Sequence, residues 1–450
     1  MPERQIAAVI LAAGHGTRMK SAKTKVLHEI GGKPMLAHVI ETAGGLSPSR
    51  LAVVIGDHAP EVGEAAKAMR PDAAVAVQAP PRGTGDAVMK AAPALEGFDG
   101  VVLILYADTP LVRAGTLADL VDAAAGGAGA VLGFRADVPG AYGRLVLDDE
   151  DDLAAIVEAK DASPEQLEID LCNSGVMAVD AAFLREALPK LEPNNAKGEY
   201  YLTDIVAMAR AAGRRFAVVE GDEEEVLGVN SRVELAVAEE VFQDRMRVAA
   251  MKNGATLIDP TTVFFAHDTI IGQDVLIEPN VFFGPGARVA DRATIKAFSH
   301  IEGAQVGEGA VVGPFARLRP GADLGPKSRV GNFVEVKKAA IGEGAKVNHL
   351  TYIGDASIGA RANIGAGTIT CNYDGYSKYK TEIGADAFIG SNSALVAPVK
   401  IGDGAYIGSG SVITRDVEAD SLAVARGRQA EVKGWAARFR KASAKGAKDD

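Results

Sequence analysis

Two hydrophobic patterns divide the chain. Up to residue 230, short apolar runs alternate with stretches whose apolar residues recur at helical spacing. The apolar runs predict strands at residues 7–12, 51–55, 74–78, 101–106, 130–134 and 216–219. Helical patterns lie between them, as at 35–42, 61–69 and 114–125. This alternation predicts a Rossmann-like α/β domain, with a mostly parallel sheet covered by helices on both faces.

From residue 271 to 417 the pattern changes to a repeat of six residues. An aliphatic residue opens each unit, Gly often follows, and a small or β-branched residue stands fifth. Units open at Ile271, Ile277, Phe283, Val312, Leu318, Leu324, Val330, Ile341, Val347, Ile358, Ile364, Ile383, Ile389, Ile401 and Ile407. This period fits neither a helix nor a hairpin, and it indicates a solenoid of stacked short strands. One insertion, 370–380, brings polar and aromatic residues into the repeat.

A single helical segment joins the two patterns. Residues 231–252 predict a helix with Ser231 as its N-cap. We therefore expect an N-terminal domain at 1–230, a linker helix at 231–252 and a C-terminal domain at 253–450. The basic tail around Trp435 ends in Ala, Lys and Asp, a composition that predicts disorder.

Charge and cysteine content narrow the function. The net charge of −11 argues against bulk binding to nucleic acid or to anionic membranes, so an anionic substrate needs a local basic patch. Two cysteines, Cys172 and Cys371, are too few for a disulfide framework and fit a reducing compartment. The apolar stretch at 6–13 has the length of a strand, not of a membrane segment. We expect a cytoplasmic protein.

A Gly-rich loop follows the first strand. It reads Leu11-Ala12-Ala13-Gly14-His15-Gly16-Thr17-Arg18-Met19, with Lys25 further on. Glycines let backbone N–H groups approach phosphate oxygens, and Arg18 and Lys25 add positive charge. A tight strand-to-helix turn is the structural alternative. Because parallel sheets bind ligands at the carboxyl ends of their strands, the loops after Leu11, Gln78 and Tyr106 should share one rim.

This loop resembles that of the sugar-nucleotide pyrophosphorylases, in which Thr-Arg-Met precedes a Pro-Lys-x-Leu segment. Here Thr24 stands in place of the proline, and Ala107 stands where the family usually has Gly. The resemblance implies magnesium ligands at Asp108 and Asn230. It further implies contacts to UTP and the sugar nucleotide from Leu11, Ala12, Ala13, Gly14, Lys25, Gln78, Gly83, Thr84, Tyr106, Ala107, Asp108, Gly143, Glu158, Asn173 and Asn230. In the implied reaction a sugar-1-phosphate attacks UTP and pyrophosphate leaves, with Lys25 and Arg18 as catalytic cations.

The six-residue repeat resembles the left-handed parallel β-helix of acyltransferases. That fold places three units in each coil and stacks coils about 4.8 Å apart. The repeat would then form roughly eight to ten coils, a prism about 40–45 Å long. Such prisms usually form trimers, with acetyl-CoA in the groove between two of them. A pure assembly scaffold is the structural alternative.

Polar residues decorate the repeat. Arg317 and Arg319, Glu335 and Lys337, His349 and the 370–380 insertion bring chemical groups to a prism that needs none for folding. With the N-terminal motifs, they resemble the bacterial bifunctional N-acetylglucosamine-1-phosphate uridyltransferase / glucosamine-1-phosphate N-acetyltransferase family over almost the whole chain. The resemblance implies His349 as general base. It assigns glucosamine-1-phosphate to Arg319, Lys337, Tyr352, Asn363 and Lys378, and acetyl-CoA to Ala366, Asn372, Tyr373, Ser391, Ser409 and Arg426.

The acetyl transfer so implied needs no acetyl-enzyme. A neutral amine attacks the thioester once a base with a pKa near 7 takes its proton, so Cys371 need not be a nucleophile. The final product of the two implied reactions, UDP-N-acetylglucosamine, would feed peptidoglycan and lipopolysaccharide synthesis. Two alternatives remain open: a nucleotidyltransferase whose β-helix only assembles or regulates, and a non-catalytic assembly protein. Intact Arg18, Lys25 and Asp108 disfavour the latter, and His349 disfavours the former.

Overall fold

The computed structural model describes residues 4–148, 152–195 and 197–446. The chain divides into two compact units, residues 1–248 and 249–450. Helix α8 (Arg232–Lys252) crosses this division. The Ser231 hydroxyl accepts a hydrogen bond from the Glu234 amide at 3.3 Å, which confirms the expected N-cap.

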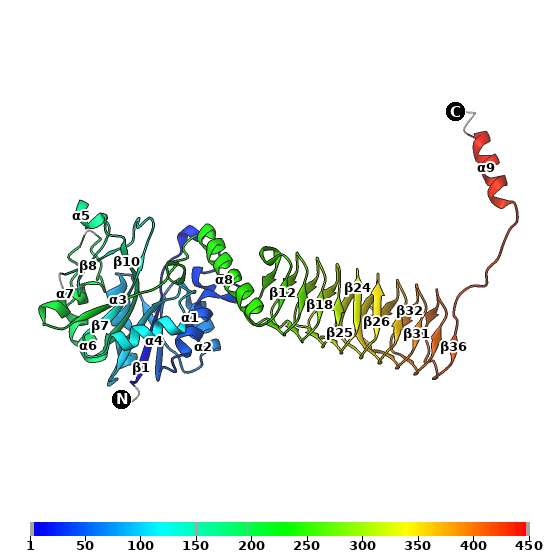
Figure 1. The fold of residues 1–450 in the computed structure, drawn as a ribbon, viewed down its shortest axis with the longest axis horizontal. Coiled ribbons are helices and arrows are strands. Elements are labelled where there is room, and N and C mark those ends of the chain that lie inside the picture. Colours follow the sequence, from blue (N-terminus) through cyan, green and yellow to red (C-terminus); the bar gives the residue numbers. More distant parts are fainter. Residues whose placement is uncertain (1–3, 149–151, 196, 447–450) are drawn as a thin grey trace. The chain divides into compact units, whose positions relative to one another are not determined.

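The first unit is an α/β sandwich built on a nine-stranded sheet (Figure 1). Its main path runs β11-β7-β10-β6-β1-β4-β5. The strands are β1 (Ile6–Ala12), β4 (Arg50–Gly56), β5 (Ala74–Gln78), β6 (Val101–Tyr106), β7 (Gly129–Arg135), β8 (Arg144–Leu147), β9 (Leu153–Val157), β10 (Leu171–Asp180) and β11 (Phe216–Glu220). All six predicted strands are present, and the mostly parallel order is confirmed. The prediction missed β8, β9 and β10.

Successive residues of β1 point to opposite faces of this sheet, as the pleat requires. Ala8 and Ile10 belong to one core, and Val9 belongs to the other. The helices of the first core are α1 (Met35–Gly44), α2 (Pro60–Met69) and α4 (Ala114–Ala123). Those of the second are α3 (Thr84–Ala91), α6 (Ala181–Ala187) and α7 (Asp204–Ala211). A short helix, α5 (Pro164–Leu167), and a small hairpin, β2 (Glu29–Ile30) with β3 (Lys33–Pro34), complete the unit. Helix α8 packs Leu235, Val241 and Phe242 against this unit, so it does more than connect.

The second unit is a parallel β-helix whose short strands stack coil on coil (Figure 1). Its repeat length is visible in the hydrogen bond from the Gln273 amide to Asp291 Oδ1, one coil on at a separation of 18 residues. The aliphatic residues that open the predicted units are all buried, from Ile271 to Ile407. The prism begins earlier than the expected residue 271, because 256–257 already pairs with 276–277.

One sheet of the prism has ten strands. They are β12 (Thr256–Leu257), β15 (Leu276–Ile277), β18 (Thr294–Ile295), β21 (Val311–Val312), β24 (Arg329–Asn332), β26 (Lys346–His349), β28 (Asn363–Ile364), β31 (Phe388–Ile389), β34 (Tyr406–Ile407) and β36 (Leu422–Ala423). Each pairs in parallel with the next, one coil further along the chain.

The other two faces share a fifteen-stranded sheet because β25 (Glu335–Ile341) and β27 (Tyr352–Ile358) cross both. One face holds β13 (Phe264–Phe265), β16 (Phe282–Phe283), β19 (His300–Ile301), β22 (Arg317–Leu318), β29 (Ile369–Cys371), β32 (Ala394–Val396) and β35 (Val412–Ile413). The other holds β14 (Ile270–Ile271), β17 (Arg288–Val289), β20 (Gln305–Val306), β23 (Ala322–Leu324), β30 (Thr381–Ile383) and β33 (Val399–Ile401).

The basic tail contains helix α9 (Trp435–Gly446), whose Trp435 and Phe439 rings stack with centroids 5.1 Å apart. The disorder predicted for the end of the tail therefore does not extend over 435–446, and residues 447–450 lie outside the described residues. Within the described ranges, no helix has both the length and the apolar character that a membrane span requires.

Candidate functional sites

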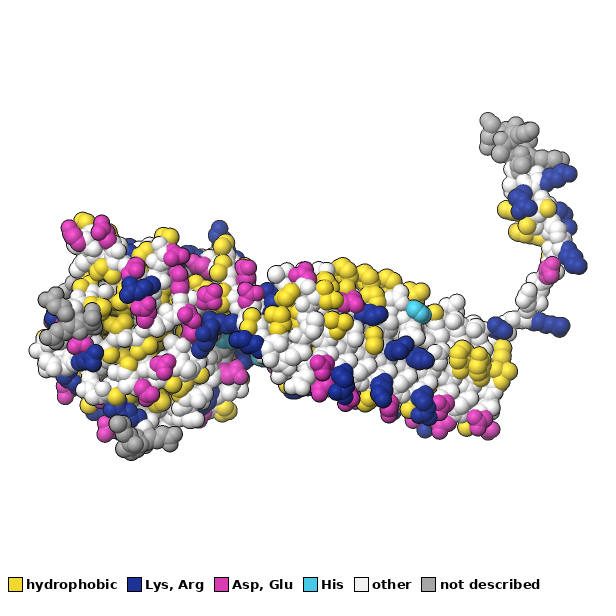
Figure 2. Space-filling model, in the orientation of Figure 1, with side chains coloured by type: hydrophobic (Ala, Val, Ile, Leu, Met, Phe, Trp, Pro, Cys, Tyr) yellow, Lys and Arg dark blue, Asp and Glu magenta, His cyan; other side chains and the backbone are white. Residues whose placement is uncertain are grey.

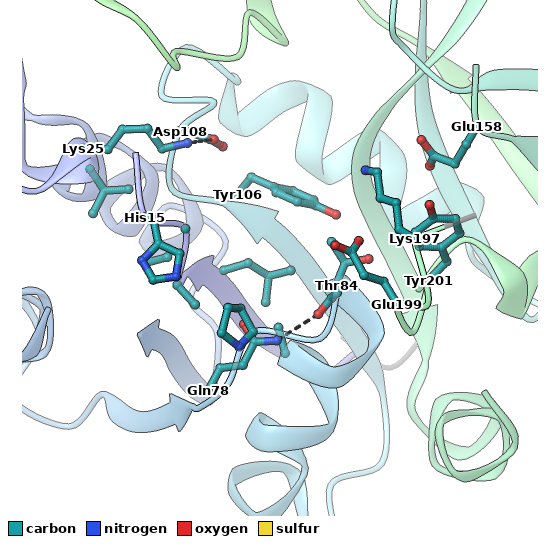
Figure 3. Close-up of a pocket in the computed structure, with 18 residues that line it drawn as sticks. His15, Lys25, Gln78, Thr84, Tyr106, Asp108, Glu158, Lys197, Glu199 and Tyr201 are labelled. Atoms are coloured by element: carbon teal, nitrogen blue, oxygen red, sulfur yellow. Dashed lines mark hydrogen bonds and ion pairs between the residues drawn. The ribbon is translucent and has the colours of Figure 1, made fainter. Parts of the chain in front are cut away.

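A cavity of about 510 Å³ lies at the carboxyl ends of β1, β5 and β6, where the sequence places a shared rim (Figure 3). Most of the predicted nucleotide-site residues line it. They are Leu11, Ala12, Ala13, Gly14, Lys25, Gln78, Gly83, Thr84, Tyr106, Asp108 and Glu158. Segments far apart in the sequence thus converge on one space large enough for a nucleotide or sugar nucleotide.

Lys25 is one of the residues that line this cavity. Its ammonium nitrogen lies 2.5 Å from Asp108 Oδ2 and 2.9 Å from Asn230 Oδ1, so the two predicted metal ligands converge on one point. Gly16 has φ +60°, and a Cβ there would lie 2.6 Å from the Lys25 Cβ. Only glycine therefore lets the Gly-rich loop lie this close to the lysine.

Gln78 ends β5 and is buried at the opposite side of the cavity (Figure 3). Its side-chain Nε2 donates to the Gly83 carbonyl at 2.9 Å and to Asp86 Oδ2 at 2.8 Å. Both amide protons are therefore used inside the chain, and this fixes the rotamer. The side-chain oxygen takes part in neither bond and remains an acceptor.

Gly143, Glu158 and Asn173 come together beside the cavity, and of the three Glu158 lines it. The Asn173 amide donates to the Gly143 carbonyl at 2.8 Å, and a Cβ on Gly143 would lie 3.6 Å from Glu158 Oε1. Burial raises the pKa of the Glu158 carboxyl, which the positive charge of Lys197 partly opposes. Burial also raises the pKa of Tyr106. These groups present hydrogen-bonding atoms in a partly desolvated corner.

Five predicted residues are not among those that line the cavity: Arg18, Ala107, Gly143, Asn173 and Asn230. Arg18 is exposed on a 3-10 turn (Thr17–Met19), and Ala107 is fully buried beneath the rim. Four functional-looking residues were missed: His15, Lys197, Glu199 and Tyr201. His15 stacks on His58 with centroids 4.0 Å apart. The other three come from the loop before α7, where charged and aromatic residues crowd between two helices, and that crowding was the available signal.

On the β-helix, three of the residues assigned to glucosamine-1-phosphate form a basic cluster. The positive charges of Arg319 and then Lys378 lower the pKa of Lys337, so the three cations lie close together. Arg319 Nη1 donates to Glu335 Oε1 at 2.7 Å, and Tyr352 stands beside Glu335 in the next coil. This is the local basic patch that the acidic chain requires for an anionic substrate. Asn363 lies on the ten-stranded sheet, away from this face.

His349 begins a column of predicted residues that continues along one edge of the prism. Its Nδ1 lies 2.6 Å from Asn332 Oδ1 in the preceding coil. The column then passes through Ala366, Ser391, Ser409 and Arg426. Backbone hydrogen bonds link it: Gly367 N to His349 O (3.2 Å), Asn392 N to Ala366 O (2.7 Å) and Gly410 N to Ser391 O (2.8 Å). At the end of the column, Arg426 Nη1 donates a hydrogen bond to the Ser409 carbonyl at 2.9 Å.

The 370–380 insertion forms a projecting loop between β29 and β30. Tyr373 pairs with Lys378, and Asp374 Oδ1 accepts the amides of Tyr376 and Ser377 at 2.8 and 2.7 Å. The Asn372 side chain is buried and donates to Asp355 at 2.5 Å, whereas Tyr373 is exposed. The insertion lengthens the coil, since Arg361 bonds Asp386 at a separation of 25 residues.

Comparison with known proteins matches both units. Residues 8–167 match the MobA-like NTP transferase domain, and residues 380–415 match the bacterial transferase hexapeptide repeats. Curated relatives match the full length. The bifunctional protein GlmU of Paramagnetospirillum magneticum is 56% identical over 100% of both chains. That of Rhodospirillum rubrum is 60% identical over 96% of this chain and 97% of its own.

The chain belongs to the GlmU family. It is a bifunctional enzyme with a nucleotidyltransferase domain and a hexapeptide acetyltransferase domain, and it serves UDP-N-acetylglucosamine synthesis. The α/β fold followed by a left-handed parallel β-helix is likewise confirmed. Family membership excludes both alternatives that the sequence left open.

Proposed function

We propose that the two units carry out successive group transfers. The unit at 253–450 acetylates the amine of glucosamine-1-phosphate with acetyl-CoA. The unit at 1–230 then transfers uridylyl from UTP to N-acetylglucosamine-1-phosphate, and the helix at 231–252 links them. The observation that carries the proposal is the cavity in which the Gly-rich loop, Gln78 and the Lys25–Asp108–Asn230 cluster meet.

In the uridylyl transfer, a phosphate oxygen of the sugar-1-phosphate attacks the α-phosphorus of UTP. The bond from the α-phosphorus to the bridging oxygen breaks, and pyrophosphate leaves with that electron pair. Lys25, with Arg18 of the Gly-rich loop, would neutralise the negative charge that develops on the phosphoryl oxygens. Because the lysine is 8% exposed, its charge acts with little screening by water.

Asp108 and Asn230 are fitted to hold Mg²⁺. Their oxygens converge on one point, and both are hard ligands of the kind Mg²⁺ prefers. No group of three His, Cys, Asp or Glu side chains forms a metal site in the described part of the chain, so further ligands would come from phosphates and water. When bound, Mg²⁺ would supply charge neutralisation at the phosphates. Lys25 would then turn from the two oxygens toward the phosphates.

Substrate choice follows from the two ends of the cavity. The side-chain oxygen of Gln78 suits uracil because it can accept a hydrogen bond from the N3–H of that base. Cytosine carries no hydrogen on N3 and cannot donate this bond. Gly143, Glu158 and Asn173 would receive the sugar, with the Glu158 carboxylate accepting from its hydroxyls. The remaining assigned residues, Leu11 to Gly14, Gly83, Thr84 and Tyr106, would shape the nucleotide wall, with Ala107 buried beneath them.

In the acetyl transfer, the amine of glucosamine-1-phosphate attacks the thioester carbonyl of acetyl-CoA directly. His349 takes the proton of the amine, the carbon–sulfur bond breaks, and CoA leaves as a thiol after protonation. The cluster of Arg319, Lys337 and Lys378 suits the sugar phosphate. The column from His349 through Ala366, Ser391 and Ser409 to Arg426 suits extended acetyl-CoA. Asn372 and Tyr373 of the projecting loop would add contacts to acetyl-CoA.

In this proposal the complete acetyl site includes residues of a second chain. Arg319 and Lys337 lie on one face of the prism, whereas Asn363 and His349 lie on the ten-stranded sheet. We infer that a second chain helps to bring these two sets of residues to one sugar. Exposed aromatic residues at one corner, Phe298, Phe315 and Phe333, stack coil on coil with centroids 4.9 and 5.2 Å apart. Figure 2 shows hydrophobic side chains gathered on the β-helix surface. These features support a homotrimer.

The proposed setting is the cytoplasm, where UTP and acetyl-CoA are available and the two thiols stay reduced.

Both activities can be tested in one vessel. The purified chain is given glucosamine-1-phosphate, acetyl-CoA, UTP and Mg²⁺, and free thiol and pyrophosphate are measured separately. The proposal expects thiol release without UTP, and pyrophosphate release that requires the acetylated sugar. Pyrophosphate without thiol would refute the acetyltransferase half.

A further inference from the structure

The imidazole of His349 is held by one specific partner. His349 ends β26 and is exposed, and its Nδ1 lies 2.6 Å from the side-chain oxygen of Asn332 at the end of β24. The two residues are in register in adjacent coils. Their backbones are also fixed, because the Leu350 amide donates to the Asn332 carbonyl at 3.0 Å. The Thr351 hydroxyl donates to the His349 carbonyl at 2.6 Å.

This hydrogen bond decides which ring nitrogen can act as a base. An amide oxygen can only accept a hydrogen bond, so the nitrogen bonded to it must carry the proton. In neutral His349 the proton is therefore on Nδ1, and the lone pair is on Nε2, on the far side of the ring. The opposite tautomer would place a proton on Nε2 and leave it unable to take one from an amine.

The charged residues around His349 cannot accept a hydrogen bond from its Nδ1, as Asn332 does. A groove of about 480 Å³ on the ten-stranded sheet is lined by Lys296, Arg329, Asn332, Asn348 and His349, among others. The charged groups lining the groove are thus two cations. Neither can accept a proton-sharing hydrogen bond from Nδ1, and the described lining of this groove includes no carboxylate.

We propose that Asn332 is a positioning residue for acetyl transfer: its side-chain oxygen fixes His349 in the tautomer that exposes a basic Nε2. The inference rests on the proposed role of His349. A neutral acceptor has a specific consequence. It orients the ring without adding a negative charge that would stabilise the protonated imidazolium.

The test uses the full-length chain and four variants: Asn332→Ala, Asn332→Asp, His349→Ala and, as a matched control, Asn348→Ala. Acetyl transfer is followed by thiol release across the pH range, and uridylyl transfer on the same samples reports folding. We expect Asn332→Ala to lower kcat for acetyl transfer about 10- to 100-fold, because the ring loses its orientation. We expect Asn332→Asp to move the acid limb of kcat/KM about one unit to higher pH, because the carboxylate stabilises the imidazolium. Asn348→Ala should leave that limb in place.

The outcomes separate the two claims. If the wild-type chain makes no thiol, or if His349→Ala retains full acetyl transfer, the proposed base fails. If His349→Ala is inactive while both Asn332 variants keep the wild-type kcat and pH profile, the base stands and the positioning role is overturned. Should Asn332→Ala also lose uridylyl transfer through misfolding, the direction of the Asn332→Asp shift decides alone.

Discussion

The two candidate sites of this chain are built in opposite ways. The nucleotidyl site is a cavity whose walls come from one unit, and its key side chains are buried, with Lys25 8% and Gln78 4% exposed. The acetyl site lies on the outside of a prism, where His349 and Tyr373 face solvent and Tyr373 is 59% exposed. A parallel sheet with crossover helices makes a pocket at its strand ends, whereas a stacked coil has no such ends. The first site can therefore be complete in one chain, whereas we propose that the second is completed by a neighbour.

The largest expected effect comes from a substitution that disables the nucleotidyl site alone. Asp108→Ala removes the carboxylate that we propose holds Mg²⁺, so the cation that would neutralise the phosphates is bound less well. We expect uridylyl transfer to fall about 100-fold or more, with acetyl transfer unchanged. Pyrophosphate and thiol release measure the two rates. A variant that keeps most of its pyrophosphate release would contradict the assignment.

The next effect concerns the basic cluster. Lys337→Ala removes a charge-assisted contact from a group of three cations. We expect KM for glucosamine-1-phosphate to rise about 10- to 100-fold with a smaller change in kcat. The matched control is Lys327→Ala, an exposed lysine at a corner of the prism that is not among the cations acting on Lys337. Equal KM values for the two variants would place the phosphate elsewhere.

The proposed dependence on a neighbour can be tested at the aromatic corner. Phe315→Glu puts a charge between Phe298 and Phe333, where an interface would have to desolvate it. We expect the trimer fraction in light scattering and the acetyl rate to fall together, several-fold, while uridylyl transfer is kept. Monomers with full acetyl transfer would show that one chain holds the whole second site.

The smallest effect is a pH dependence at the sugar corner. Because burial raises the pKa of Glu158, this carboxylate takes up a proton at a higher pH than an ordinary glutamate does as the pH falls. KM for N-acetylglucosamine-1-phosphate should therefore begin to rise earlier in an acid titration. Measured between about pH 5 and 8, Glu158→Gln should have a raised and nearly flat KM. A wild-type KM as flat as that of the variant would exclude Glu158 from sugar binding.

Local patterns in the sequence predict most of the fold. The aliphatic residues that open the six-residue units are buried, and the six apolar runs of the first unit are strands. Strand β10 was missed because Asn173 and Ser174 interrupt its apolar run and Gly175 has φ +87°. Its place between β6 and β7 depends on pairing with distant residues, which no local pattern records.

The site residues also divide into those that local sequence motifs predict and those that only the folded chain brings together. Residues carried by motifs, such as Lys25, Asp108 and Gln78, do meet in the cavity. Lys197, Glu199 and Tyr201 were missed because only the folded chain brings their loop to that cavity. The bond from His349 to Asn332 spans 17 residues, close to one coil, yet coil spacing alone does not say which side chains will meet.

The central claim is that two independent sites share this chain, and His349→Ala tests it most directly. Thiol release from acetyl-CoA and pyrophosphate release from UTP with N-acetylglucosamine-1-phosphate are measured on the same purified variant. The account predicts that acetyl transfer falls about 100-fold or more while the uridylyl rate equals that of the wild-type chain. Unchanged thiol release, or a parallel loss of both activities in a folded variant, would contradict it.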